Sequence, residues 1–65
     1  MKYIITTSMG NKIVRLENGE SAVMGKSMTY GSRYVWIIRK DRETFVCGRT
    51  MKDCAERFAE KMFNA

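Results

Sequence analysis

Residues 51–63 are the only part of this chain that repeats apolar side chains with helical spacing, and this constrains the fold more than any other feature. The repeated positions are Met51, Cys54, Ala55, Phe58, Ala59, Met62 and Phe63. This i, i+3, i+4, i+7 spacing predicts an amphipathic helix, opened by Thr50 with Asp53 in a variant of the capping box. Because no second helix is predicted, the apolar stripe, with Phe58, Met62 and Phe63, must be buried against a sheet.

The segment before the helix reads as short strands separated by turns. Runs of β-branched and aromatic residues predict strands at residues 2–7, 12–16, 21–24, 32–40 and 43–48, in a chain without proline. Met9-Gly10-Asn11 predicts a hairpin, Asn18-Gly19 favours a type I′ turn, and residues 25–31 read as a loop. The predicted fold class is therefore α+β: an antiparallel meander of four or five strands with one C-terminal helix on one face, in a single small domain, 1–65.

The last two predicted strands form a hairpin whose register decides which side chains face the helix. A two-residue loop at Asp41-Arg42 would pair Ile38 with Phe45 and Trp36 with Cys47. These four residues then form the surface on which the helix packs. The opposite face of the sheet would carry Arg33, Val35, Ile37, Arg39, Thr44 and Val46.

Composition indicates a folded globular protein. The chain has 65 residues, of which 45% are hydrophobic and 29% charged. It has no run of 18 apolar residues, so no membrane span is predicted. The N-terminus, Met1 to Thr6, becomes polar too early for a secretory signal. We expect a native start, a complete small reading frame and a cytoplasmic protein.

The cysteines, Cys47 and Cys54, are too few for a disulfide framework and fit a reducing cytosol. Both fall at positions that we interpret as inward-facing, where cysteine behaves as a small buried hydrophobe. The chain has no histidine, so we expect neither a metal site nor a cofactor. A small core without a disulfide or a structural metal predicts marginal stability, which oligomerisation or a partner could raise.

The sequence offers little for catalysis, and we do not expect an enzyme. Without histidine there is no Cys–His or Ser–His pair to supply a nucleophile and its base. The tripeptide Gly25-Lys26-Ser27 suggests a phosphate-binding loop. That motif also needs a glycine five residues before Gly25, and this position is Glu20.

The positive charge lies entirely outside the predicted helix. Residues 51–65 carry three basic and three acidic residues, whereas residues 1–50 carry nine Lys/Arg against four Asp/Glu, which is the whole net charge of +5. The strand-rich part is therefore the predicted working surface. Its arginines suit phosphates, with Tyr30, Tyr34 and Trp36 as candidates for stacking on bases, while solubility alone also accounts for the charge.

The apolar residues Val35, Ile37 and Val46 on the predicted outer face point to a protein interface instead. Clustered exposed aliphatics usually mark a contact surface. The alternative is that the sheet curls and the N-terminal strands cover this face as a second small core.

The segment Ser32 to Glu60 carries the patterns Trp36-x-Ile38-x-Lys40, Phe45-x-x-Gly48 and Thr50-x-x-x-Cys54-Ala55-x-x-Phe58-Ala59. In these it resembles the three-strand-plus-helix DNA-binding domain of plant ethylene-response factors, and is equally similar to the arm-site-binding domain of phage-type integrases. The resemblance implies a sheet laid in the major groove and backed by the helix, with Arg33, Arg39 and Arg49 as DNA contacts. Val35, Ile37 and Val46 do not fit this resemblance, because polar or basic residues that contact DNA are expected at these positions.

In layout the chain is also similar to small phage-encoded inhibitors, including anti-CRISPR proteins, which occupy a functional surface of a larger host machine. The leading hypothesis is therefore a non-enzymatic phage or mobile-element inhibitor of a host protein or nucleoprotein complex. The runner-up is a small DNA- or RNA-binding protein, and a third hypothesis is a homodimer whose sheet faces pair. The predicted binding residues are Arg33, Val35, Ile37, Arg39, Arg42 and Val46.

Overall fold

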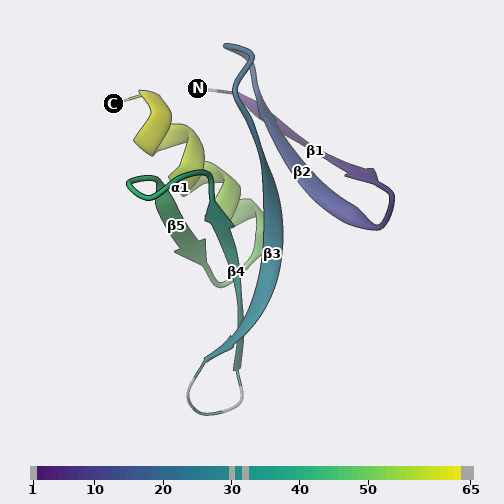
Figure 1. Ribbon diagram of the computed structural model, residues 1–65, viewed down its shortest axis with the longest axis vertical. Coiled ribbons are helices and arrows are strands. Elements are labelled where there is room, and N and C mark those ends of the chain that lie inside the picture. Colours follow the sequence, from purple (N-terminus) through teal and green to yellow (C-terminus); the bar gives the residue numbers. More distant parts are fainter. Residues whose placement is uncertain (1, 30, 32, 64–65) are drawn as a thin grey trace.

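The computed structural model describes residues 2–29, 31 and 33–63, and shows a five-stranded antiparallel sheet followed by one helix (Figure 1). The strands are β1 (Tyr3–Ser8), β2 (Asn11–Leu16), β3 (Ser21–Thr29), β4 (Arg33–Arg39) and β5 (Phe45–Gly48), and the helix is α1 (Met51–Phe63). The strands lie in chain order, so the sheet is a simple meander with β1 and β5 at its edges. The predicted α+β fold class is confirmed.

Helix α1 begins where the capping pattern predicts. The backbone N–H of Asp53 donates to Thr50 Oγ1 at 3.0 Å, and this contact satisfies one of the amides that the first turn leaves without a helical partner. The buried face consists of Cys54, Ala55, Phe58 and Ala59. Phe63 was predicted to be buried, but its side chain is 69% exposed, because it lies in the last turn, beyond the core.

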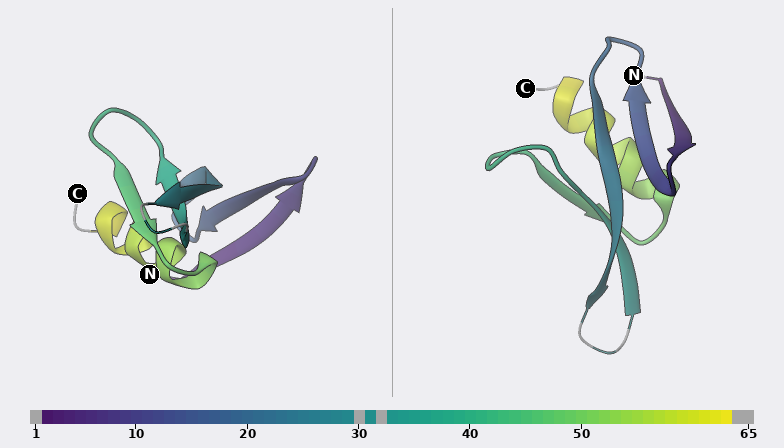
Figure 2. Two further views of the ribbon diagram at one scale, coloured as in Figure 1. Left: turned by 90° about the horizontal axis from the view of Figure 1, so that it is seen from below. Right: turned by 45° about the vertical axis from the view of Figure 1, so that its right-hand side comes forward.

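The core lies between α1 and one face of the sheet. Val14, Leu16, Met24 and Ile38 contribute the buried side chains of the sheet, and Trp36 packs against them while partly exposed. The sheet curls toward the helix, so that α1 contacts β1 as well as β4 and β5 (Figure 2).

The first N-terminal hairpin turns where the sequence predicts, whereas the second uses a different turn from the one that the sequence favours. Met9 and Gly10 both have positive φ (51° and 83°), so the type I′ turn forms here. At Asn18-Gly19 only Gly19 has positive φ (95°), and Leu16 N–H donates to the carbonyl of Glu20 across a three-residue loop. The type I′ prediction for Asn18-Gly19 was therefore wrong. The Asn18 side chain instead accepts a hydrogen bond from Glu20 N–H at 2.9 Å, which stabilises the longer loop.

The predicted loop at 25–31 was also largely wrong, because β3 continues to Thr29. Lys26 lies opposite Trp36, and Met28 lies opposite Tyr34. The Lys26 ammonium lies over both rings, 4.8 Å from the Tyr34 centroid and 5.6 Å from that of Trp36, and these contacts favour continued pairing. The β3–β4 ribbon therefore projects beyond the helix (Figure 1). Tyr30, the other predicted stacking residue, lies outside the described residues.

The β4–β5 register differs by one residue from the prediction. Ile38 pairs with Val46, and Arg39 pairs with Phe45. Lys40 N–H donates to the Thr44 carbonyl at 3.0 Å, so the loop contains three residues rather than two. The cause is the Asp41 carboxylate, which accepts from the backbone N–H groups of Thr44 (2.8 Å) and Glu43 (2.9 Å) and so closes the longer turn.

Candidate docking surface

The face of the sheet opposite α1, here called the outer face, is the candidate site. Side chains alternate between the two faces of a strand, so the buried residues of each strand identify the outward positions on either side of them. The apolar and basic residues at these outward positions are Ile4, Ile13, Arg15, Val23, Arg33, Val35, Ile37, Arg39, Phe45 and Cys47.

The structure corrects the predicted site at Val46. A one-residue change of register moves every side chain of a strand to the other face. Val46 therefore lies on the helix side, opposite Ile38, and packs against the core. Phe45 and Cys47, which were predicted to lie beneath the helix, take its place on the outer face. Four of the six predicted binding residues, Arg33, Val35, Ile37 and Arg39, share this face as expected.

The N-terminal strands do not fold back over the outer face. β1 and β2 extend the same sheet, and the curl brings β1 toward α1 on the opposite side (Figure 2). The alternative of a second small core on this face is therefore wrong for the described part of the chain.

The centre of the outer face is apolar and open. Val23 is 57% exposed and Phe45 is 44% exposed, while Val35 and Ile37 are half-buried between neighbouring strands. Gly25 lies directly opposite Ile37, so no side chain covers Ile37 from β3. Removing such side chains from water stabilises a complex by about 25 cal/mol per Å² of apolar area.

Arginines provide the charge on this face. Arg15, Arg33 and Arg39 occupy outward strand positions, and none of the described outward strand positions holds an acidic residue. The Arg39 guanidinium lies 5.4 Å from the centre of the Phe45 ring, which holds a cation beside the apolar centre. Arg42, the sixth predicted residue, is exposed in the β4–β5 loop. The face therefore combines an apolar centre with positive charge.

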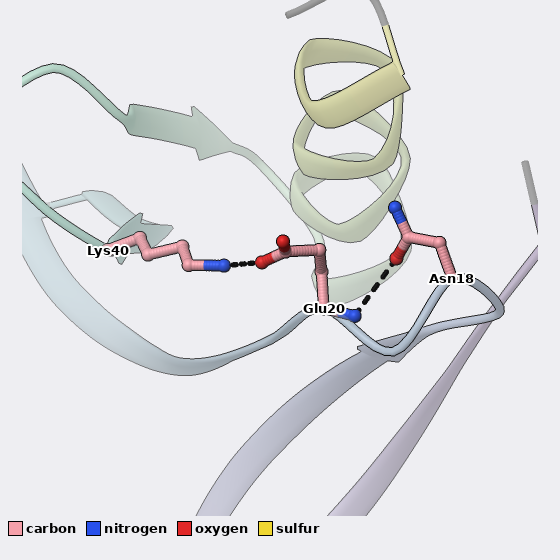
Figure 3. A network of polar contacts seen from close by, with 3 residues as sticks. All are labelled: Asn18, Glu20 and Lys40. Carbon is pink, nitrogen blue, oxygen red and sulfur yellow. Dashed lines mark hydrogen bonds and ion pairs between the residues drawn. The ribbon is translucent and has the colours of Figure 1, made fainter.

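Several other basic residues are engaged elsewhere. Lys40 forms an ion pair with Glu20, which is itself held by Asn18 in the β2–β3 loop (Figure 3). Arg57 pairs with Asp53 along the helix at 3.6 Å. Lys61 Nζ donates to the Phe45 carbonyl at 3.4 Å. The basic residues at the described outward strand positions of the outer face are all arginines.

The two cysteines differ in environment. Cys54 is buried as predicted, and burial raises the pKa of its thiol to about 11. Cys47 is exposed, contrary to the prediction, because the register change turns it outward. An exposed thiol on the candidate surface is a useful chemical probe of that surface.

Part of the surface was not predicted from the sequence. Ile4, Ile13, Arg15 and Val23 were not named as binding residues, although Ile13 and Arg15 alternate with the buried Val14 and Leu16. This alternation along β2 was the sequence signal that could have placed Ile13 and Arg15 on the outer face.

No group of three or more His, Cys, Asp or Glu side chains that could hold a metal ion occurs among residues 2–29, 31 and 33–63. Within the same described part of the chain, the helix is neither long nor apolar enough to cross a membrane. No family model matches the chain, and no match was found among curated proteins or solved structures.

Proposed function

We propose that this chain is a non-enzymatic binding protein that docks onto another protein through the outer face of its sheet. The proposal rests on the uncovered apolar centre, which consists of Val23, Val35, Ile37 and Phe45 and lies beside arginines, with no acidic residue at the described outward positions. Interfaces commonly join an apolar core to a charged or polar rim. The complementary partner surface has an apolar centre and acidic surroundings.

We extend the proposal to the class expected from the sequence, a phage or mobile-element inhibitor of anti-CRISPR or similar anti-defence type that blocks a larger host complex. The support is the layout: a sheet that keeps one face for its own helix and leaves the other open, in a chain of only 65 residues. A chain of this size can inhibit by occupying a functional surface, without any chemistry of its own.

The test of the docking face compares two substitutions of matched exposure. Val23→Asp changes an outer-face side chain that is 57% exposed, and Tyr34→Asp changes one on the helix side of the β3–β4 ribbon that is 54% exposed. Immobilised wild-type protein is expected to retain a partner from nuclease-treated host lysate. Val23→Asp should lose the same partner, because a buried unpaired carboxylate is costly, while Tyr34→Asp should keep it.

Circular dichroism establishes that both variants remain folded. Equal binding by wild type and Val23→Asp would contradict docking through the outer face. Loss of binding only in Tyr34→Asp would move the docking site to the ribbon.

Nucleic-acid binding is the second candidate, and the β3–β4 ribbon favours it. Residues 21–39 carry Lys26, Arg33 and Arg39 and no acidic residue. The cluster of Lys26 with Tyr34 and Trp36 also combines a cation with aromatic rings, as single-strand binding surfaces do. Fluorescence anisotropy with duplex DNA and single-stranded RNA tests this candidate, since Lys26→Ala should weaken the binding of all sequences alike and lower the salt slope by about one.

A further inference from the structure

The two edges of the sheet are protected to different degrees. β5 has four residues, runs directly into the helix, and has Lys61 Nζ on the carbonyl of Phe45. β1 has six residues, Tyr3 to Ser8, all of them uncharged. The lysine beside it, Lys12 of β2, donates to the Thr7 hydroxyl at 2.8 Å and not to a backbone group of the open edge. Short strands and lysines at an edge suppress pairing with other chains, whereas a longer uncharged edge permits it.

The register shows which backbone groups β1 presents at its open side. Glu17 N–H donates to the Lys2 carbonyl at 3.2 Å, so Lys2 and every second residue after it direct their backbone groups toward β2. Tyr3, Ile5 and Thr7 therefore direct their N–H and C=O groups away from the sheet. These groups can accept another strand without any rearrangement of β1.

We infer that β1 pairs antiparallel with β1 of a second copy of this chain, about a two-fold axis at Ile5, to form one continuous sheet. In this register Ile5 bonds its own counterpart, and Tyr3 bonds the counterpart of Thr7, so the outward backbone groups of both strands are satisfied. Ile4 lies opposite the counterpart of Thr6, and Lys2 opposite that of Ser8. No like charges meet, which is the argument for a second copy as the occupant.

This interface differs from the dimer predicted from the sequence, in which sheet faces would pair. Edge pairing leaves the outer face open, so the inference does not depend on the proposed docking function. Each copy carries a net charge of +5, so the two copies repel at low ionic strength. Association should therefore strengthen with salt, whereas binding of nucleic acid weakens with salt.

Sedimentation equilibrium of the wild-type chain, up to about millimolar concentration and in about 0.05 M and about 0.5 M salt, tests the inference. We expect a reversible dimer that is tighter at the higher salt. Ile4→Lys should raise the dissociation constant by at least about tenfold, because it brings two lysines close to the axis. Val23→Lys is the matched control, since Val23 is 57% exposed and Ile4 60%, but Val23 lies on a central strand.

The register itself is tested by a compensating change. In the double variant Ile4→Lys, Thr6→Glu, each lysine lies opposite a glutamate of the other copy, so dimerisation should be restored relative to Ile4→Lys alone. Amide hydrogen exchange at Ile5 and Thr7 should slow as concentration rises, while exchange at Phe45 and Cys47 on the other edge should not change. A monomer throughout the concentration range, or slowed exchange at β5 instead of β1, would overturn the inference.

Discussion

At the scale of single residues, Gly48 fixes how closely the helix approaches the sheet. A Cβ atom at this position would lie 2.5 Å from the backbone nitrogen of Cys54 and 2.9 Å from its Cα. These are atoms of the first helical turn and cannot rotate away. The absence of a side chain at Gly48 therefore allows α1 to follow β5 directly.

Gly48→Ala should lower the free energy of unfolding by about 1–3 kcal/mol, the usual range for overpacking a well-packed site. Gly25→Ala is the control, because the nearest atom to its added Cβ is Ile37 Cγ1 at 4.0 Å, an ordinary contact. Urea unfolding followed by circular dichroism measures both. Equal stability of the two variants would contradict the close approach at Gly48.

Asp41 is the residue that determines the β4–β5 register. The backbone N–H groups of Thr44 and Glu43 lower the pKa of its carboxyl below the ordinary value of 3.8. A carboxyl with a lowered folded-state pKa contributes stability that is present above pH 3.8 and is lost as the pH falls through the folded-state pKa.

Asp41→Asn keeps a side-chain oxygen acceptor but removes the charge. Wild type should therefore be more stable than Asp41→Asn at neutral pH, and the difference should shrink toward zero as the pH falls through the folded-state pKa. Urea midpoints at a series of pH values measure this. A difference that stays constant from neutral to acidic pH would show that the carboxylate charge does not act on the loop.

At the scale of elements, the helix could be predicted from sequence and the hairpin register could not. The helix is specified locally, because one apolar stripe and the Thr50 cap coincide. The register depends on whether the loop after Lys40 contains two or three residues, and the sequence pattern allows both. The hydrogen bonds of Asp41 decide between them, and with them the face on which Val46, Phe45 and Cys47 lie.

The middle and the C-terminal end of α1 contribute unequally to its packing on the sheet. Phe58 is fully buried, so Phe58→Ala should cost about 3–5 kcal/mol and unfold a marginally stable domain. Phe63, at 69% exposed, should cost much less when replaced by alanine. Thermal unfolding of the two variants compares them. A comparable loss of stability in both would contradict the placement of the core.

At the scale of the whole molecule, the two sides of the curled sheet have different roles. Its inner side encloses the helix and supplies the core, and its outer side presents aliphatic residues and arginines. The sequence predicts this division and all four outward residues of β4, which are Arg33, Val35, Ile37 and Arg39. It could not place β5 correctly or extend the surface to Val23, because both depend on pairing between strands that composition does not determine.

If the outer face is the docking surface, a bound partner should protect Cys47 from alkylation. Cys47 lies exposed on that face, whereas Cys54 is buried with the pKa of its thiol raised to about 11, so a thiol reagent should modify Cys47 alone in the folded protein. Host lysate should slow this modification in wild type, also after nuclease treatment, but should not slow it in Val23→Asp. An unchanged alkylation rate at lysate concentrations where the wild-type chain retains a partner would contradict docking through this face.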